Sequence, residues 1–340
     1  MKQIILFFLM VFIFSFSTCS RNTLNENDFI TTVRNGTTTV IGYKGSTKDV
    51  IIPHKINDLS VTVIRDATFK NSQLTSVTIP KTVTEIGNRT FYSNQLTNVT
   101  IPNNVTIIGD NAFAENKLTS LTIPKSVTKI GGAAFSNNLL TSVTIPDGVI
   151  SIGYAPFVFC PELTSINVSP KNPNYKSVEG VLYNKDGTTL VQWPAGITGT
   201  ANIPKGVTSI GRSAFNGNKL ADVIIPNSVI SIERYAFGNN QLTNIIIPNS
   251  VVSIGDLAFA NNQLTNVFIP GSVTSIGNFA FSNNKLTSIT FEKNSVKLEN
   301  QAGSEIIEDK VISSNLADIY ARFGAGTYTR SINSNRWTRD

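Results

Sequence analysis

Eight prolines mark a strict 22-residue period, and this period constrains the fold more than any other feature of the sequence. They fall at Pro80, Pro102, Pro124 and Pro146 and, after a gap, at Pro204, Pro226, Pro248 and Pro270. The same text recurs around each proline, as in residues 118–124 (LTSLTIP), and is followed by recurring Ile, Phe and Asn positions. A chain that repeats one unit this regularly is expected to stack identical units along an axis.

Each unit reads as one strand and a return segment. In residues 74–79, Val77 and Ile79 alternate with Ser76 and Thr78, which is the period of a half-buried strand. Pro80 has no amide hydrogen and ends the strand. A period of about 20 to 29 residues with L-x-x-L-x-L spacing is the signature of leucine-rich repeats. We therefore predict a right-handed leucine-rich-repeat solenoid with a parallel β-sheet face, strands about 4.8 Å apart, and about 9 coils of 22 residues.

Three residue types recur at fixed offsets and predict the interior. The phenylalanines are expected to stack as one continuous column, and the asparagines to satisfy buried backbone groups with their amides. The glycines are expected where backbones approach closely, although Arg65 and Glu233 break their series. Cys160 occupies an asparagine position, so a small buried residue is favoured over a reactive thiol. The sets are Phe69, Phe91, Phe113, Phe135, Phe157, Phe215, Phe237, Phe259 and Phe281; Asn94, Asn116, Asn138, Asn218, Asn240, Asn262 and Asn284; and Gly87, Gly109, Gly131, Gly153, Gly211, Gly255 and Gly277.

The recurring Leu-Thr-Ser-Val-Thr-Ile-Pro, Val-Thr-Ser-Ile-Gly and Ala-Phe blocks resemble the treponemal, or BspA-like, leucine-rich repeat class of bacterial surface proteins. The resemblance covers residues 50–291. It implies a non-catalytic cell-surface interaction or adhesion protein that binds protein partners, such as extracellular matrix or cell-surface components, through the solenoid face. The alternative is a periplasmic or secreted structural scaffold that binds bacterial envelope proteins or glycans.

Residues 1–19 read as an export signal. Lys2 precedes an apolar run from Ile4 to Phe16, which as a helix would rise only about 20 Å and is too short for a bilayer core of about 30 Å. Residues 16–19 resemble a relaxed bacterial lipobox, so Cys19 is a candidate for lipidation and membrane anchoring. The alternative is ordinary cleavage near Ser17 or Ser20. Either way we expect an exported protein, at the cell surface or as an outer-membrane lipoprotein, otherwise secreted.

The two ends of the repeat array read as caps, which open solenoids require. Residues 20–49 form a linker and a hairpin, with strands at 29–34 and 37–43 around a primed Asn35-Gly36 turn. Residues 292–340 form a C-terminal cap. It is expected to contain a helix from Ser314 to Phe323 that Gly324 stops. A closing hairpin at 327–330 and 336–338 would carry Tyr328 and Trp337.

The array is interrupted once, because Pro146 and Pro204 are separated by two periods plus 14 residues. The insertion, residues 169–200, holds two short apolar segments around an Asp186-Gly187 turn, and a projecting hairpin is the simplest account. One interpretation is a change of shape in the middle of the solenoid. The other is a dedicated binding loop displaying Tyr175, Tyr183 and Trp193.

The composition excludes several function classes. One histidine, His54, and two cysteines cannot supply the usual ligands of a zinc site or an iron-sulfur cluster, so no metal and no cofactor is expected. The net charge of +6 is spread along the repeats without a basic stripe, which disfavours nucleic-acid binding. The carboxylates Glu85, Asp110, Glu115 and Asp256 fall on separate coils rather than converging. We therefore predict that the chain is not an enzyme.

The outward strand positions change character along the chain. In the first half they are small and polar, beginning with Ser76 and Thr78, and read as solubility. In the second half three become apolar and would form a stripe of about 10 Å across adjacent strands, and exposed apolar patches with a polar rim often mark partner sites. Coverage by a cap and self-association are the alternatives. The predicted partner-binding residues are Asp222, Ile224, Asn244, Ile246, Asn266 and Phe268.

Overall fold

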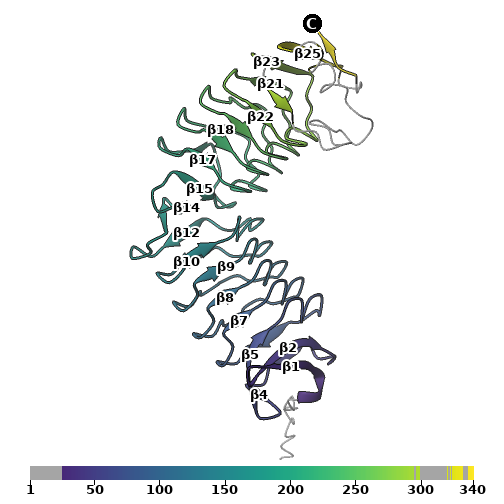
Figure 1. Cartoon of the computed structure of the whole chain (residues 1–340), viewed down its shortest axis with the longest axis vertical. Coiled ribbons are helices and arrows are strands. Elements are labelled where there is room, and N and C mark those ends of the chain that lie inside the picture. The colour runs from purple at the N-terminus through teal and green to yellow at the C-terminus, as the bar shows by residue number, and fades with distance from the viewer. Residues whose placement is uncertain (1–24, 295, 299–319, 321, 323, 332–335) are drawn as a thin grey trace, which may run out of the picture.

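The computed structural model describes residues 25–294, 296–298, 320, 322, 324–331 and 336–340. These residues form a parallel β-solenoid of about 12 turns with almost no helix, and the coils stack along one arched axis (Figure 1). The turns exceed the predicted 9 because β2 and β15, in the cap and the insertion, also pair in parallel with the next coil. The predicted leader with Cys19 and residues 314–319 of the predicted helix lie outside the described residues.

One side of the solenoid carries two long sheets built mostly of two-residue strands. In these sheets the buried isoleucine of one coil pairs with the isoleucine or leucine of the next, as Ile86 does with Ile108 and Ile276 with Leu298. The first sheet runs through β1 (Phe29–Arg34), β2 (Thr37–Tyr43), β5 (Leu59–Ile64), β7 (Glu85–Ile86), β8 (Ile107–Ile108), β9 (Lys129–Ile130) and β11 (Ser151–Ile152), with β4 (Lys55–Ile56) beside β5. The second runs through β13 (Tyr175–Val178), β14 (Val181–Asn184), β15 (Thr189–Gln192), β17 (Ser209–Ile210), β19 (Ser231–Ile232), β20 (Ser253–Ile254), β22 (Ser275–Ile276) and β24 (Lys297–Leu298).

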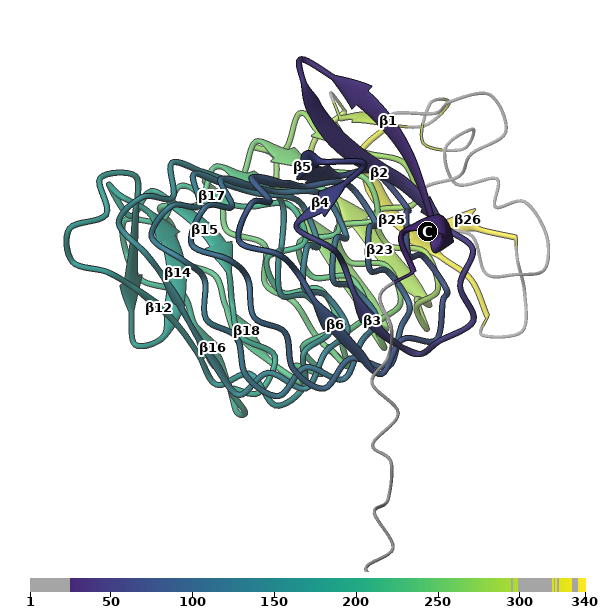
Figure 2. The ribbon, with the colours of Figure 1, turned by 90° about the horizontal axis from the view of Figure 1, so that it is seen from below.

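The parallel sheet predicted over the L-x-x-L-x-L segments is divided into pairs of strands. Apart from the terminal cap strands, those segments pair only two at a time, on the opposite side of the coils, where Figure 2 shows β16 and β18 across from β15 and β17. An arched stack cannot hold both sides at the spacing of about 4.8 Å that a ladder needs. We call this side the split face. Its pairs are β3 (Asp49–Ile51) with β6 (Ser76–Thr78), β10 (Ser142–Ile145) with β12 (Ser165–Val168), β16 (Ala201–Asn202) with β18 (Val223–Ile224), and β21 (Asn266–Ile269) with β23 (Ser288–Phe291).

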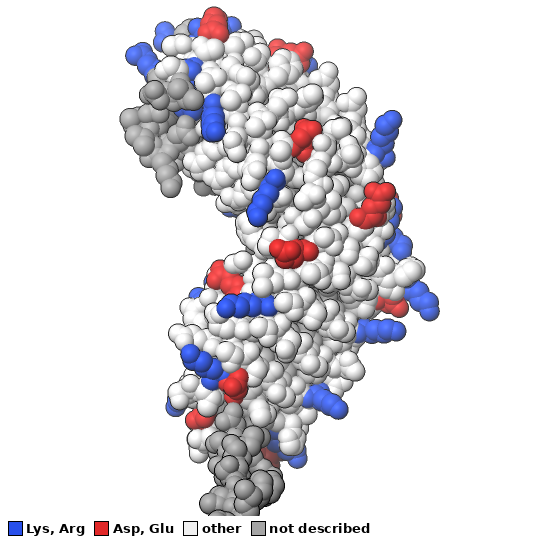
Figure 3. Space-filling view, turned by 180° about the vertical axis from the view of Figure 1, so that it is seen from behind, with Lys and Arg blue, Asp and Glu red and all other residues white. Residues whose placement is uncertain are grey.

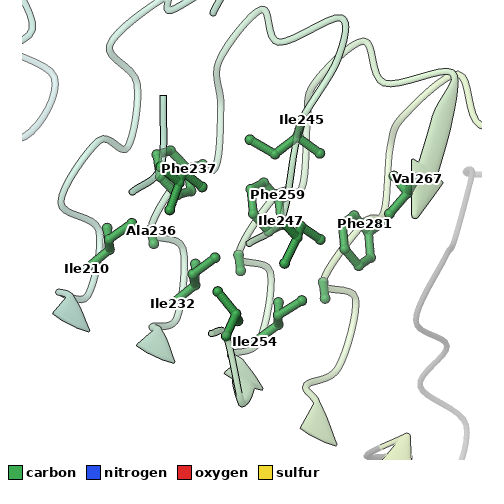
Figure 4. Close-up of a cluster of buried hydrophobic side chains, with 14 of the residues drawn as sticks. Ile210, Ile232, Ala236, Phe237, Ile245, Ile247, Ile254, Phe259, Val267 and Phe281 are labelled. Carbon is green, nitrogen blue, oxygen red and sulfur yellow. The ribbon is translucent and has the colours of Figure 1, made fainter. Parts of the chain in front are cut away.

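The phenylalanine positions form two aromatic stacks, not one continuous column. All nine predicted rings are fully buried, and neighbouring centroids within a stack lie 4.9 to 5.7 Å apart. The first stack runs from Phe69 to Phe157. The second begins at Trp193, 5.2 Å from Phe215, and ends at Phe281. Figure 4 shows Phe237, Phe259 and Phe281 side by side with the isoleucines of their coils.

The predicted asparagine ladder is confirmed. Asn240 is buried, donates through Nδ2 to the carbonyls of Phe215 (2.8 Å), Phe237 and Gly238, and accepts at Oδ1 from the Leu220 amide (3.0 Å). Each amide thus joins its own coil to the one before. Cys160 takes this place in its coil, and its Sγ lies 3.4 Å from the Phe135 carbonyl oxygen. Burial raises the pKa of the Cys160 thiol to about 12, so the thiol stays protonated at neutral pH.

The glycine series marks a close approach between coils, as predicted. A Cβ at Gly131 would lie 2.4 Å from the backbone nitrogen of Asp110, a distance no side chain tolerates. At Glu233, one of the two exceptions, Oε2 accepts a hydrogen bond from the Arg212 amide of the preceding coil (3.1 Å). In regular coils an acid after the glycine accepts instead from the following coil, as Asp110 does from the Gly132 amide (2.7 Å).

The insertion forms a three-stranded antiparallel unit, β13, β14 and β15, so the predicted hairpin is present with one additional strand. The binding-loop interpretation is wrong, because Tyr183 and Trp193 are buried. Tyr175 is partly buried and its hydroxyl accepts from the Ile152 amide at the end of the first sheet (2.8 Å). The insertion is therefore a change of shape that ends one sheet and begins the next.

The strand pairs predicted for the two caps are present among the described residues. The short helix η1 (Glu26–Asp28) leads into the β1–β2 hairpin, whose turn residues Asn35 and Gly36 have φ values of 51° and 73°. At the other end β25 (Gly326–Thr329) pairs antiparallel with β23, and β26 (Thr338–Arg339) pairs with β25. Tyr328 and Trp337 are buried there. The Gly324 amide donates to the Tyr320 carbonyl (2.8 Å) at a φ of +70°, which ends the helical turn.

Candidate interaction face

The apolar stripe predicted on the second half of the chain is exposed. Ile224, Ile246 and Phe268 have exposed fractions of 55%, 76% and 50%. Their strand neighbours point inward, and Ile245, Ile247 and Val267 are buried in the core (Figure 4). The stripe therefore follows from the alternation of inward and outward side chains in three successive coils, with apolar residues at the outward positions, although Ile246 itself lies outside the assigned strands.

Backbone hydrogen bonds hold these three coils in register just before the stripe. The Gln241 amide donates to the Leu220 carbonyl (2.8 Å), and the Gln263 amide donates to the Leu242 carbonyl (2.9 Å). The split face contributes only one strand pair at each end of the stripe: Ile224 lies opposite Asn202, and Phe268 lies opposite Thr290. The stripe thus ends at a polar residue on both sides.

The C-terminal cap adjoins the stripe. Thr290 is partly buried and lies opposite Thr327 of β25, with 3.0 Å between the two hydroxyl oxygens. Phe268, one coil earlier, remains half exposed. The described part of the cap therefore reaches the edge of the stripe and stops there.

The predicted polar rim lies beside the stripe, because Asp222, Asn244 and Asn266 are all exposed. A cavity of about 400 Å³ opens next to Asp222 and is lined by Pro161, Ile197, Thr200 and Leu220 among others. The Thr200 hydroxyl lies 3.4 Å from Oδ2 of Asp222. The repeat pattern did not reveal this cavity, because part of its wall comes from residues 195–200 at the end of the insertion.

The first half of the split face is hollowed between coils. A groove of about 630 Å³ is lined by Ser76, Thr78, Asn98 and Thr100, and another of about 570 Å³ by Thr122 and Ser142 among others. Both grooves lie where successive segments do not pair as strands. The sequence analysis interpreted this polar array only as solubility. The grooves depend on the distance between successive coils, which cannot be read from the identity of the residues.

Charged side chains of one sign do not gather into a large patch on the face that Figure 3 shows. On the face that Figure 3 shows, lysines, arginines and acids are scattered among uncharged residues. Asp110 and Asp256 each accept a backbone amide hydrogen bond from the following coil, from Gly132 and Asn278. Glu115 accepts from the Tyr92 hydroxyl, and this bond raises the pKa of Tyr92. These acids hold coils together rather than meeting at one site.

Two absences concern the described part of the chain alone. There, three or more His, Cys, Asp or Glu side chains do not gather as potential metal ligands. Residues 25–294 and the described segments after them also contain no helix with the length and hydrophobicity to cross a membrane.

Comparisons with known proteins agree with the geometry. The family model described as BspA type leucine rich repeat region matches residues 62–178 and 198–306 in six copies. No curated protein matches the chain. Three solved structures are similar to it, and the first, the pneumococcal vaccine antigen PcpA, shares 23% identity at a TM-score of 0.60, covering 82% of this chain and 87% of PcpA.

The other two come from Eubacterium ventriosum and Faecalibacterium prausnitzii. A leucine-rich repeat protein from Eubacterium ventriosum shares 26% identity at a TM-score of 0.57, with 78% of this chain and 69% of that chain covered. A leucine rich cell surface protein from Faecalibacterium prausnitzii shares 26% identity at a TM-score of 0.52, with 82% of this chain and 98% of that chain covered.

Proposed function

The chain belongs to the BspA-type leucine-rich repeat family, and on that premise we propose that it is an exported, non-catalytic protein that binds a protein partner through the stripe Ile224, Ile246 and Phe268. Proteins of this fold serve as interaction scaffolds. The similar structure from Faecalibacterium prausnitzii is that of a cell surface protein. This supports a location outside the cytoplasm. As further parts of the proposal, matrix or cell-surface proteins are the class of partner, and Cys19, at the end of the lipobox-like residues 16–19, is the point of a lipid anchor.

The observation that carries the proposal is the exposure of three large apolar side chains in consecutive coils. At these positions the coils of the first half carry threonine, as at Thr78, Thr100 and Thr122. A side chain that is 50% to 76% exposed contributes little to the core, so the apolar residues are not explained by folding. Apolar anchors within a polar rim are the usual centre of a protein interface.

The stripe has a natural extension in the cavity beside Asp222. A partner whose apolar ridge covers Ile224 and Ile246 would place a neighbouring side chain over this cavity of about 400 Å³. The carboxylate of Asp222 favours a basic or hydrogen-bond-donating group there. The Asn244 and Asn266 amides can both donate and accept, and would surround the contact with hydrogen bonds.

The experiment replaces the stripe with the residues of the other coils, as Ile224→Thr, Ile246→Thr and Phe268→Thr in one variant. The matched control is Ile150→Thr, Ile230→Thr and Val252→Thr, which also changes three exposed apolar side chains to the threonine found at the equivalent positions Thr84, Thr106 and Thr274. Both variants are measured by surface plasmon resonance against purified matrix and cell-surface proteins that bind the unchanged chain.

Loss of two interfacial anchors at about 2 kcal/mol each corresponds to a loss of affinity of roughly a thousandfold. We expect this loss for the stripe variant and an unchanged affinity for the control. Equal binding by both variants, with both folded, would place the interface elsewhere. If the stripe variant instead abolishes dimers of the unchanged chain, the stripe is a surface for self-association.

A second function has one observation in its favour. The hydroxyl and amide groups that line the grooves near Thr78 and Thr122 suit an envelope glycan, as a periplasmic or secreted scaffold would bind. Protease treatment of intact cells separates the two functions. A surface protein is cleaved, whereas a periplasmic scaffold is shielded until the envelope is opened.

A further inference from the structure

The N-terminal strand β1 ends the first long sheet. Among the described strands, β2 pairs with one edge of β1, and no strand pairs with its other edge. The six residues of β1 therefore present backbone donors and acceptors along a free edge, which is a template for pairing with another strand. Val33 in this strand is 59% exposed, and Ile30 and Thr32 are also exposed.

The sequence of this edge is complementary to itself. Two copies of β1 that pair antiparallel about Thr31 place Asp28 of one copy opposite Arg34 of the other, and Phe29 opposite Val33. Each of these contacts occurs twice because of the two-fold symmetry. Opposite charges and apolar pairs directly across two antiparallel strands are both stabilising.

Contacts within one copy hold Asp28, Phe29 and Arg34 in positions that suit this register. Asp28 is the last residue of η1, directly before β1, and its carbonyl accepts from the Lys44 amide (2.7 Å). Its carboxylate accepts from Asn25 Nδ2 (3.3 Å), so both bonds fix Asp28 beside the start of the strand. Phe29 is partly buried, and its ring centroid lies 5.3 Å from that of Tyr43, which leaves part of the ring for a second contact. Arg34 is exposed at the far end of the strand, opposite Thr37.

The neighbouring symmetric register is less favourable. Pairing about Thr32 would place Arg34 opposite Ile30 and Asp28 opposite Gly36, and both charges would lose their partners. A register that places Thr31 of one copy opposite Thr32 of the other is not possible. Directly opposed side chains would then point to opposite faces of the sheet, which antiparallel pairing does not allow. Charge and strand geometry thus select the register centred on Thr31.

We propose that a second copy of this chain is the partner of the β1 edge, and that the two copies form a symmetric dimer through antiparallel β1 pairing centred on Thr31. The first long sheet then continues across the two-fold axis from one copy into the other. This contact lies at the N-terminal end of the solenoid (Figure 1). It leaves the stripe at Ile224, Ile246 and Phe268 free in both copies.

The test is a charge exchange, measured by sedimentation velocity on residues 20–340. Asp28→Arg places two arginines opposite each other across the dimer, and Arg34→Asp places two aspartates opposite each other. Each variant alone turns both charge pairs of the dimer into like-charge pairs, and we expect a dimer dissociation constant raised about tenfold or more. The control Lys81→Asp changes an exposed charge away from β1 and is expected to leave the dimer intact.

An equal mixture of the two variants restores both opposite-charge contacts, and we expect heterodimers in it. Lys44 lies opposite Asp28 within the hairpin, so Asp28→Arg also adds a like charge inside one copy. That cost is present in the variant alone and in the mixture, so recovered association in the mixture comes from contacts between copies. The proposal is overturned if the unchanged chain is monomeric, if either variant dimerises as well as the unchanged chain, or if the mixture does not recover.

Discussion

At the scale of single residues, the asparagine ladder is the main polar device of the interior. Asn262 donates to the carbonyls of Phe237, Phe259 and Ala260 and accepts from the Leu242 amide (3.0 Å). One side chain thus satisfies four backbone groups that turn geometry leaves without strand partners. Cys160 makes only a weak sulfur contact in the same place, so its coil depends on packing to a greater extent.

Removing one amide from the ladder should be costly. Asn262→Ala leaves the buried Leu242 amide without its partner, and an unsatisfied buried group costs about 1 to 3 kcal/mol. It also removes one of two donors from each of the carbonyls of Phe237, Phe259 and Ala260. We expect the free energy of unfolding to fall by about 2 to 4 kcal/mol in urea denaturation. The control is Asn249→Ala in the neighbouring coil, where the side chain is exposed, and its effect should stay within about 0.5 kcal/mol. Equal effects of the two changes would contradict the role of the ladder.

At the scale of elements, the insertion shows how a solenoid can be interrupted and resumed. Gln192 accepts from the Phe157 amide through Oε1 (3.1 Å), where regular coils use a backbone carbonyl, as Phe113 does with Ala134. Trp193 then starts the second aromatic stack. Its indole Nε1 is buried and has no hydrogen-bond partner within the described part of the chain, so the ring is retained for its packing.

Two substitutions at Trp193 separate packing from polarity. Trp193→Phe keeps a ring against Phe215 and removes an unsatisfied donor, so we expect a change in the free energy of unfolding below about 1.5 kcal/mol. Trp193→Ala opens a cavity at the head of the stack and should cost about 3 to 5 kcal/mol. Thermal and urea unfolding of both variants would check this. A similar loss in both would mean that the indole itself, rather than an aromatic ring, is required.

Strand positions were only partly predictable, as a comparison of three nearly identical segments shows. Residues 74–80 and 140–146 share the sequence LTSVTIP, and both contain a strand, whereas residues 118–124 differ by one leucine and form none. Whether a segment pairs there depends on its distance from the next coil. The true long sheets use two-residue strands such as Ile107–Ile108, and two residues are too few to show alternation.

The hairpin caps and the stripe were predictable because local sequence determines them. The Asn35-Gly36 turn is specified by its own residues, which accept positive φ. The outward direction of Ile224, Ile246 and Phe268 follows from their place between buried neighbours in the repeat. The cavity beside Asp222 requires Pro161 and Ile197 from other parts of the chain, and a repeat pattern does not place these relative to one another.

At the scale of the whole molecule, the chain has two hydrophobic cores in one stack of coils. One core ends at Leu182 and the other begins at Val181, so the two meet at β14 within the insertion. In a linear array each coil is stabilised by its neighbours. A destabilising substitution should therefore lower the stability of its own half of the solenoid first, and have a smaller effect on the half beyond the insertion.

Hydrogen exchange of the native protein tests this division. Phe113→Ala should accelerate exchange of amides in residues 50–166 by about tenfold or more, while residues 200–290 remain protected. Phe259→Ala should reverse the pattern. Mass spectrometry of peptides from the two halves distinguishes these outcomes. Acceleration through the entire chain from either change would show that the insertion couples the halves as strongly as a regular coil does.

The bond from each ladder asparagine to the preceding coil spans a constant 25 residues, as from Asn116 to Phe91 and from Asn240 to Phe215. Unequal recombination between repeats of the gene could therefore add or delete one unit of 22 codons and restore every interior bond at the new junction. Shifts of any other number of codons would break the column. The length of the solenoid can thus evolve in steps of one coil, without redesign of its interior.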